Sequence, residues 1–526
     1  MDTLRQKLTW LWNNVEKLLI ILFFTTFTLN IRKVFLTKYS FLNGGFNEYL
    51  TPSFTWADLL ILLTIFIYII KYLYCQFRAY YEIITVSEYK FSIKSILNPK
   101  SITHATIFLF LFFLWAGSSI FWAKFPLISW HRFATWLELL FFSVIAYKLF
   151  HEKRWQQYLL LALIANGLFQ SALAIIQFLA NSSIGLHFLG ESLLGPNING
   201  VAKIIILHMK HIRAYGTLPH SNILSGFLII PQVLATNLVL VRLFSLYGRK
   251  TRGIIVSHET LSDKIPTRLA VNIWIILTLG LLVTFSRSAI LSDLIAMIIL
   301  VLWNMKRFHA ISSTPTNQST NNRPSFFPSL FHSFSGVAEN LSRTAEKQKY
   351  CFSRRVAIFS ALALVIALFT LTFVAKTYTT LFSEQSLAER KQYSAVSCEI
   401  ISHHPLVGIG LGQFVFREHL KYPHLPSWQY QPVHNIYLLI ASELGTIGVS
   451  LALVSLITYL GHTWREAKEK GSILTIFKYY VITISFLVIS FFDHYFWDIK
   501  IGTIIFIAPI LFLAIFSKNI PDSTKE

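Results

Sequence analysis

The stretch HNIYLLIASELG, residues His434–Gly445, stands where a long polar segment (376–433) runs into an apolar one that ends near Leu460. This transition puts His434 at a boundary between water and hydrocarbon. Because an imidazole has an unperturbed pKa near neutrality, a histidine there can take a proton from a substrate hydroxyl and release it again. Asn435 is expected to cap the following helix and so to set where His434 points. The alternative is an interfacial histidine without a chemical role.

The composition is that of a membrane protein. Of the 526 residues, 54% are hydrophobic and only 13% are charged, whereas soluble domains contain about 25% charged residues. The apolar run near the N-terminus has no visible small-residue cleavage site, so we expect a retained first span. Cys75, Cys351 and Cys398 are far apart and form no CxxC pattern, which argues against a disulfide framework or a zinc site. No metal site and no cofactor is predicted.

Hydropathy predicts an all-α, polytopic integral membrane protein with about twelve transmembrane helices. The first span, the fourth and the pair around residue 285 are the least regular, because they are short or interrupted. The predicted spans lie near residues 14–30, 54–70, 101–120, 133–147, 156–180, 221–241, 269–285, 288–304, 356–375, 434–460, 474–492 and 500–516.

The distribution of basic residues predicts the orientation in the membrane. With the N-terminus in the cytoplasm, the predicted inner loops and both tails hold 29 Lys and Arg, whereas the outer loops hold 14 despite comparable length. This is the bias of the positive-inside rule. The net charge of +21 is therefore explained by the lipid bilayer and does not indicate nucleic acid. The same orientation places His434 outside the cytoplasm.

The loops differ in character. Segment 305–355 contains a low-complexity polar run and is expected to be a cytoplasmic linker. Loops 181–220 and 376–433 mix Gly, Pro and aromatic residues with isolated charges, so we expect two ordered extracytoplasmic loops. The predicted divisions are 1–180 (N-terminal transmembrane helices), 181–220 (outer loop), 221–304 (transmembrane helices), 305–355 (linker), 356–375 (one helix), 376–433 (outer loop), 434–516 (C-terminal transmembrane helices) and 517–526 (cytoplasmic tail).

An arginine interrupts the apolar sequence TFSRSAIL, residues 284–291. The flanking apolar runs are together too long for one helix, so they predict two short helices with Arg287 between them. A guanidinium at membrane depth costs roughly 3 kcal/mol or more unless it pairs or lines a wet cavity, which marks Arg287 as a functional candidate. The alternative is that Arg287 snorkels to the outer interface. Asp293, six residues on, would turn away from Arg287 on a regular helix.

A second charged stretch belongs to the loop before His434. Residues 386–403 are expected to form an amphipathic helix on the outer surface that carries Arg390, with Pro405 and the glycines of GIGLG (408–412) ending it. No strand precedes the glycines, so they predict a tight turn that lets the backbone approach a neighbouring helix rather than a nucleotide fingerprint. The alternative for Arg390 is an ordinary solvated charge.

The sequence RAYGTLPHSN, residues 213–222, closes the other outer loop onto a span. Ser221 or Asn222 is expected to cap that helix. His220 would then face the same compartment as His434, although a purely structural turn is the alternative.

These elements in this order resemble the O-antigen ligase and O-antigen polymerase superfamily. The resemblance is carried by SRSA at 286–289, by the Arg390 segment that ends in HPLVGIGLGQF, and by HN and ELG at the two ends of residues 434–445. It covers roughly residues 200–500. The sequences YGTLPHSN and FDHY (492–495) look like those of less studied bacterial branches of the superfamily. Tyr393 stands three residues after Arg390, where the family usually has an aromatic four residues after its arginine.

The resemblance implies a metal-independent, inverting glycosyltransferase of the C-class membrane architecture in the bacterial cytoplasmic (inner) membrane. It implies a polyprenyl-diphosphate-linked glycan as donor and a glycan, lipid or protein hydroxyl as acceptor, on the outer side. The implied roles are a general base for His434, diphosphate binding for Arg287 and Arg390, further substrate binding for Asn435 and His220, and supporting positions for Glu443, Asp493 and His494. Glu443 is out of phase with His434 on a regular helix and is expected to pack rather than to react.

Other functions fit the same sequence. Within the same chemistry, a polymerase would use a second lipid-linked glycan as acceptor, whereas a ligase would use lipid core, protein or cell wall. From a different class, a flippase or transporter for lipid-linked sugars also contains interrupted helices and buried charges. In this chain, however, the motifs lie in or beside the outer loops.

Overall fold

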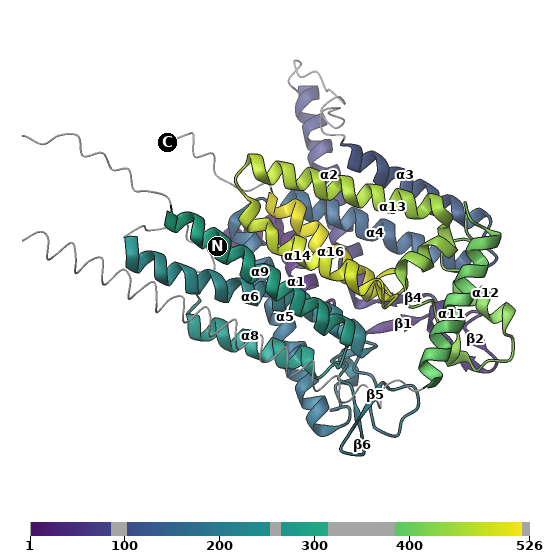
Figure 1. Cartoon of the computed structure of the whole chain (residues 1–526). Helices are drawn as coiled ribbons and strands as arrows, with labels where there is room; N and C mark the ends of the chain where they lie inside the picture. Colours follow the sequence, from purple (N-terminus) through teal and green to yellow (C-terminus); the bar gives the residue numbers. More distant parts are fainter. Residues whose placement is uncertain (1, 86–102, 253–264, 314–383, 518–526) are drawn as a thin grey trace, which may run out of the picture.

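The computed structural model describes residues 2–85, 103–252, 265–313 and 384–517. These residues are mostly helical, as predicted (Figure 1). The helices are α1 (Asp2–Thr26), α2 (Trp56–Thr85), α3 (His104–Ser118), α4 (Pro126–Leu149), α5 (Lys153–Ala180), α6 (Ser221–Arg252), α8 (Thr267–Leu282), α9 (Arg287–Ser313), α11 (Glu384–His403), α12 (Phe414–Lys421), α13 (Ile436–Glu469), α14 (Ile473–Ile489), α15 (Tyr495–Asp498) and α16 (Lys500–Ser517).

The apolar helices make the chain a polytopic membrane protein. Seven of the described helices are long and apolar enough to cross a bilayer, namely those of α2, α3, α5, α6, α9, α13 and α16. α8 and α14 are apolar but shorter. The predicted span 356–375 and most of the predicted linker 305–355 lie outside the described residues, so the number of twelve spans stays a prediction.

Several helices are longer than the spans predicted for them. α1 begins at Asp2 rather than near residue 14, α4 begins at Pro126 rather than 133, and α13 continues to Glu469. Hydropathy detects only the part of a helix that lies in hydrocarbon. Its polar ends keep their backbone hydrogen bonds and extend into the interface beyond that part.

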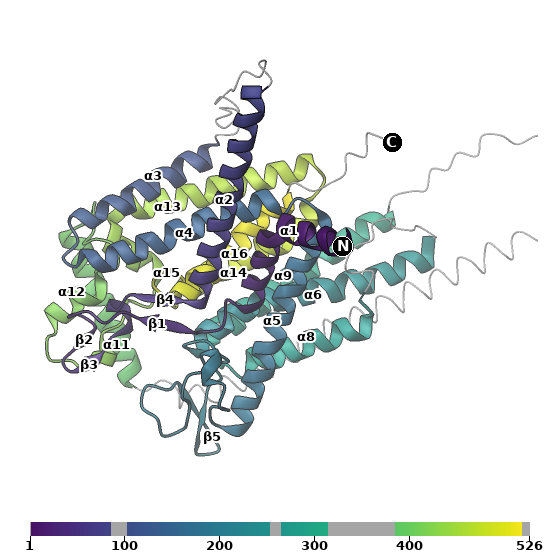
Figure 2. The same cartoon turned by 180° about the vertical axis from the view of Figure 1, so that it is seen from behind.

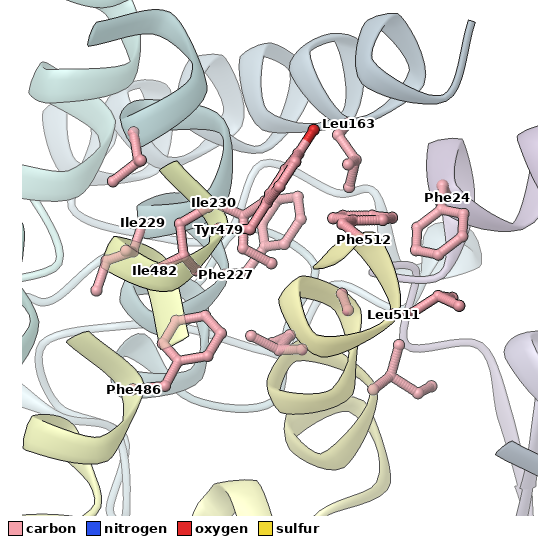
Figure 3. Close-up of a cluster of buried hydrophobic side chains, with 14 of the residues drawn as sticks. Phe24, Leu163, Phe227, Ile229, Ile230, Tyr479, Ile482, Phe486, Leu511 and Phe512 are labelled. Carbon is pink, nitrogen blue, oxygen red and sulfur yellow. The ribbon is translucent and has the colours of Figure 1, made fainter. Parts of the chain in front are cut away.

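α6 is the central helix of the bundle. In its apolar stretch, 94% of the residues are buried within the protein. Figure 3 shows side chains of α6, such as Phe227, packed with residues of α1, α5, α14 and α16, including Phe512. Membrane helices approach closely through small residues. Gly167 of α5 allows this here, because a Cβ at that position would lie 2.6 Å from the Pro231 ring of α6.

Three short antiparallel strand pairs lie in the connecting segments. β1 (Arg32–Val34) pairs with β4 (Ser53–Thr55), β2 (Phe41–Leu42) with β3 (Gly45–Phe46), and β5 (Lys203–Ile206) with β6 (Met209–Ile212). Figures 1 and 2 show β1–β4 together with α11 and α12 at one end of the helices.

Segment 27–55, which contains β1–β4, corrects the expectation of only two ordered outer loops. It is a third ordered connection, and it packs on segment 384–433. The Asn47 amide donates to the carbonyls of Ser427 and Tyr430 at 3.2 and 3.1 Å. Its strands are two or three residues long, too short for an alternating pattern to stand out in the sequence.

Candidate functional site

Six segments that are far apart in the sequence meet at the end where β1–β4 and α11 lie. They contain most of the candidate residues, and their contacts define the site. The segments are the region around Tyr49, residues 213–222 before α6, the α8–α9 turn at 283–287, the first turns of α11 around Arg390, His434 before α13, and residues 490–498 between α14 and α16.

His434 lies between two aromatic rings. The Tyr393 ring of α11 is stacked on it, with centroids 5.7 Å apart and planes at 9°. The His494 ring meets it edge to face, with centroids 4.8 Å apart and planes at 85°. Burial, followed by the charges of His494 and Arg390, lowers the pKa of His434 well below its ordinary value. His434 is therefore a neutral imidazole at physiological pH, able to accept a proton.

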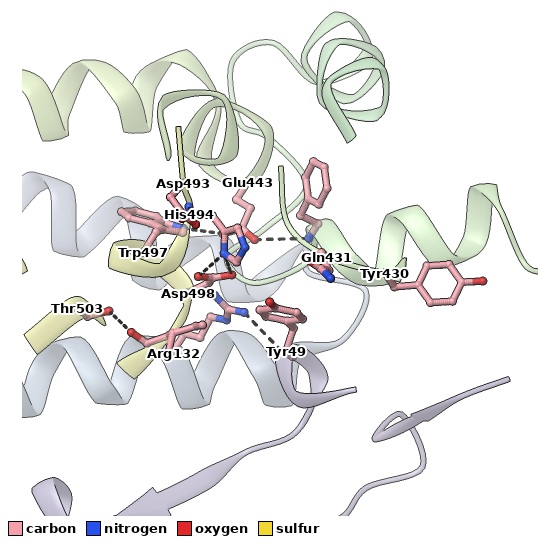
Figure 4. Close-up of polar contacts among 12 residues, drawn as sticks. Tyr49, Arg132, Tyr430, Gln431, Glu443, Asp493, His494, Trp497, Asp498 and Thr503 are labelled. Atoms are coloured by element: carbon pink, nitrogen blue, oxygen red, sulfur yellow. Dashed lines mark hydrogen bonds and ion pairs between the residues drawn. The ribbon is translucent and has the colours of Figure 1, made fainter. Parts of the chain in front are cut away.

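His494 and Asp498 form a buried pair in the turn around α15 (Figure 4). Nδ1 of His494 lies 2.9 and 3.0 Å from the two carboxylate oxygens, and the two side chains are 6% and 1% exposed. Burial alone lowers the pKa of His494, but the charge of Asp498 and the hydrogen bond to it outweigh burial and raise the pKa above its ordinary value. The carboxylate also orients the ring against His434.

A chain of hydrogen bonds connects the loop before α6 to the same turn. Arg213 donates from Nε to the Thr284 carbonyl at 2.7 Å and from Nη2 to the side-chain oxygen of Asn222. The Asn222 amide donates to Oδ2 of Asp493 at 2.7 Å, and Oδ1 of Asp493 accepts from the His494 backbone N–H at 2.9 Å. Asp493 thus links Arg213 to the histidine pair.

Arg287 and Arg390 lie close to Arg213. Arg287 is the first residue of α9, after a turn in which Phe285 has a φ of 51°, so the predicted break between two helices is present. Arg390 donates from Nη1 to the Phe492 carbonyl at 3.3 Å. Burial, together with the charges of Arg287 and Arg390, lowers the pKa of Arg213 to about 10. Three guanidinium groups thus gather near Asp493, with a net charge that suits an anionic ligand.

His220 is the residue that caps α6, and the prediction of Ser221 or Asn222 is wrong. The first helical N–H groups bond to the His220 carbonyl, and the Asn222 N–H donates to His220 Nδ1 at 3.1 Å. Burial, followed by the charges of Arg213 and His494, lowers the pKa of His220 to about 3. His220 therefore stays neutral. Its Nδ1 accepts a hydrogen bond from the backbone at the start of the helix, as a serine or asparagine side-chain oxygen usually does.

Asn435 caps α13, as predicted. Its side-chain oxygen accepts from the Leu438 N–H at 3.1 Å, and its amide reaches the Phe491 carbonyl at 3.4 Å. Both polar groups are engaged within the protein, and they attach the start of α13 to the end of α14. This cap positions His434, the preceding residue.

The glycines of residues 408–412 form the tight turn that the sequence predicts. Gly408, Gly410 and Gly412 all have positive φ, at 66°, 100° and 75°. The N–H of Gly410 donates to the backbone carbonyl of Glu443 at 2.8 Å, so the turn lies directly on α13. The Glu443 carboxylate faces the interior, where it accepts from the Trp497 indole at 2.9 Å (Figure 4).

α13 is broken where it meets this turn. Gly445 has a φ of 67° and a ψ of −175°, far from helical values. The N–H of Thr446 donates to the Pro405 carbonyl at 2.8 Å and that of Ile447 to the Leu406 carbonyl at 3.4 Å, so the loop replaces hydrogen bonds that the helix loses. The sequence did not predict this break, because single glycines are common in unbroken membrane helices.

The site contains residues that sequence reasoning did not single out. Tyr49 packs its ring against His494 with centroids 5.6 Å apart, and Arg132 of α4 lies close enough for its charge to act on the pKa of His494 (Figure 4). Asp498 follows His494 by four residues, a spacing that places both on one side of a helical turn and was a usable signal. Tyr49 and Arg132 had none, because their segments are distant in the sequence.

Among the residues that the structure describes, no three His, Cys, Asp or Glu side chains form a set that could hold a metal ion. Asp493 and His494, the nearest approach to such a set in the sequence, are instead engaged with Asn222 and Asp498.

The fold and the site together define a class of protein. It is a polytopic membrane protein in which basic groups for an anion and a neutral histidine for a proton meet at one end of the helices. The sequence model of the family described as O-antigen ligase matches residues 272–453, from α8 into α13. This match confirms the resemblance to the O-antigen ligase superfamily found in the sequence, and it supports a membrane glycosyltransferase of the ligase or polymerase type.

The matched region contains Arg287, Arg390, His434 and Glu443, and it ends before Asp493 and His494. The comparison with curated proteins finds no match for the chain.

Proposed function

We propose that the protein transfers a glycan from a polyprenyl-diphosphate carrier to an acceptor hydroxyl on the extracytoplasmic side of the bacterial cytoplasmic membrane, as an O-antigen ligase does. The observation that supports this most strongly is the juxtaposition of Arg213, Arg287 and Arg390 with His434. A lipid diphosphate gains negative charge as it leaves, and planar guanidinium groups bind phosphate oxygens in pairs. In this proposal, arginines hold the leaving group without a metal.

The transfer is a single displacement that inverts the anomeric carbon. The acceptor oxygen forms a bond to that carbon while the bond to the diphosphate oxygen breaks, and the diphosphate leaves with the electron pair. The hydroxyl proton passes to His434, which is neutral because its pKa is depressed. The His494–Asp498 pair lies next to this ring and orients it, and Asn435 and His220 keep the surrounding backbone in place.

Transfer in proteoliposomes tests the proposal. The purified chain is supplied with lipid-linked glycan and a candidate acceptor, and a covalent product is expected that persists in excess chelator. Movement of the lipid-linked glycan across the bilayer without a product would make the protein a transporter. Loss of transfer in EDTA with recovery in Mg²⁺ would contradict the arginine-only account, and Asp493 would be the first residue to examine.

His434→Ala is expected to lower turnover by more than tenfold while the donor still binds, because a general base typically contributes about 10²–10⁴-fold. The matched control is His419→Ala, because His419 is a half-buried histidine of α12 whose ring meets Tyr430 edge to face, outside the site. Equal turnover in the two variants would make His434 a structural residue.

The acceptor separates a ligase from a polymerase. If lipid-linked glycan alone yields longer chains on the carrier, the protein is a polymerase. If a product requires an acceptor that is not lipid-linked, it is a ligase. Both results keep the chemistry proposed for Arg287, Arg390 and His434.

A further inference from the structure

A polar cavity lies beside the site, between segment 27–55, α4 and the connection from α15 to α16. Its volume is about 80 Å³. Since a buried water needs roughly 10–15 Å³ of such space, the cavity has room for about five to eight waters. Arg32 and Glu48 line it, form an ion pair at 3.3 Å, and are 32% and 37% exposed, so they mark where it reaches solvent.

The cavity shares part of its wall with the site. Asp498 lines it and also accepts from His494 Nδ1 at 2.9 Å, and Tyr49 lines it and packs its ring against the His494 ring. His494 in turn contacts His434. A group bound in the cavity is thus separated from the proposed base by a single residue, which is where a sugar unit next to the reacting atoms would lie.

The charges around the cavity offset one another. Lys500 forms ion pairs with Asp58 and Glu138, as Arg32 does with Glu48. A phosphate therefore gains little electrostatic attraction in the cavity, whereas it gains more at the three arginines of the site. A hydroxyl both donates and accepts a hydrogen bond, so a ring with several hydroxyls matches a wall in which ammonium, guanidinium and carboxylate groups are mixed.

The wall also contains an unused donor and flat apolar surface. Arg132 is 8% exposed, and its Nη1 makes no hydrogen bond with any residue that the structure describes. A buried N–H without an acceptor is unfavourable, and a ligand oxygen would satisfy it. The indole rings of Trp136 and Trp497, with centroids 4.4 Å apart, also line the cavity and offer faces for the C–H side of a sugar ring.

We propose that this cavity is a subsite for one uncharged, hydroxyl-rich pyranose unit of a substrate glycan, with Arg132 Nη1 donating to one of its oxygens. The inference rests on the proposed function in taking this glycan to be a substrate of transfer. Donor and acceptor glycans share the chemistry, and the kinetics below separate them.

The test combines a cavity-filling variant with a donor-removing one. Thr135→Phe puts a ring into the cavity, Arg132→Gln removes the guanidinium, and Ala134→Phe is the matched control because Ala134 is the exposed neighbour of Thr135 on α4. Calorimetry on the full-length protein in nanodiscs measures binding of methyl pyranosides of neutral hexoses and N-acetylhexosamines. We expect no binding to Thr135→Phe, about tenfold weaker binding to Arg132→Gln, and unchanged binding to Ala134→Phe.

In the transfer assay, Arg132→Gln should raise one KM about tenfold, whereas Ala134→Phe should leave both KM values unchanged. A change in the KM of the lipid-linked glycan assigns the subsite to the donor, and a change in the other KM assigns it to the acceptor.

Outcomes of this test separate the subsite from the proposed function. If the glycosides bind wild type and Thr135→Phe equally, or bind neither, the subsite is wrong even when transfer occurs. If they bind through the cavity but no transfer is found, the subsite stands and the proposed function falls. Should Thr135→Phe fail to fold, unchanged binding and unchanged KM values in Arg132→Gln would overturn the inference.

Discussion

Arg390 and Lys391 are neighbours in the sequence but face different surroundings. Arg390 is half-buried and donates to the Phe492 carbonyl, whereas Lys391 is exposed. Successive residues of a helix point about 100° apart, so Lys391 cannot take the place of the Arg390 side chain. The sequence alone does not reveal which of two adjacent cations points inward.

Substitutions at the arginines test their role in holding the diphosphate. We expect Arg287→Lys to lower kcat/KM at least tenfold, and Arg287→Ala to do no better, because lysine keeps the charge but loses the paired geometry. Arg390→Lys should also lose activity, since Lys391 is not placed to compensate. Arg417→Lys, at an exposed arginine of α12, is the control. If the lysine variants keep near wild-type kcat/KM, charge alone suffices.

Asp498→Asn tests whether the His494–Asp498 pair tunes His434. Without the carboxylate, the pKa of His494 falls and its ring loses the proton near neutral pH. The charge of His494 is one of the groups that lower the pKa of His434, so that pKa should rise. The acid limb of the kcat/KM profile should therefore move to higher pH, while kcat drops about tenfold or more. An unmoved acid limb would mean that Asp498 only stabilises the fold.

The sequence indicated the arginines and the histidine of the site but not the residues that contact them. Arg287 and His434 stand at the ends of apolar spans, where a polar residue needs an explanation, and Arg390 lies in the loop before His434. Tyr49 and Arg132 reach the site only through tertiary packing, so no local pattern marks them. His220 was expected on the same side as His434, and the structure brings the two close together. Its use as a helix cap could not be foreseen, because an imidazole rarely takes that position.

At the scale of elements, the break in α13 determines how the loop of segment 384–433 meets the bundle. Gly445 adopts backbone angles that are essentially restricted to glycine. A Cβ there would collide with the Leu406 carbonyl. Next to the break, the backbone carbonyl of Glu443 accepts from Gly410 of the glycine turn, and its carboxylate accepts from Trp497. One short stretch therefore holds both His434, before α13, and the turn after α11.

Gly445→Ala is expected to destabilise the protein by roughly 1–3 kcal/mol, the usual cost of a strained backbone. The control is Gly461→Ala in the same helix, where an added Cβ meets nothing within 4 Å and should be neutral or slightly stabilising. Thermal unfolding in detergent compares the two. Equal melting temperatures would show that the broken conformation of α13 is not required.

At the scale of the whole molecule, the described helices correspond to the predicted spans far better than the connections do. Long apolar runs specify helices locally, since every backbone group in a membrane must be bonded within its own segment. Segment 27–55 is different, because its short strands are held by distant partners such as Ser427 and Tyr430. The cavity beside the site depends on that segment, so it could not be predicted from hydropathy.

The order of the helices supports one orientation, which cysteine labelling tests. Segments 27–55, 213–222, 283–287 and 490–498 each join one helix to the next, and all reach the site, so they lie on the same side of the membrane as Arg390 and His434. The 29-to-14 bias in basic residues predicts that this side is the exterior.

Cys398 is an exposed free cysteine of α11 and serves as a natural reporter. With Cys75 and Cys351 replaced by serine, a membrane-impermeant maleimide should label Cys398 in intact spheroplasts. In the control, Cys398 is also replaced and Lys470→Cys is introduced in the exposed turn after α13, where labelling should require permeabilisation. Since a polyprenyl-diphosphate donor for export is consumed outside, labelling of Cys398 only from the cytoplasm would reverse the membrane orientation and remove the proposed reaction with it.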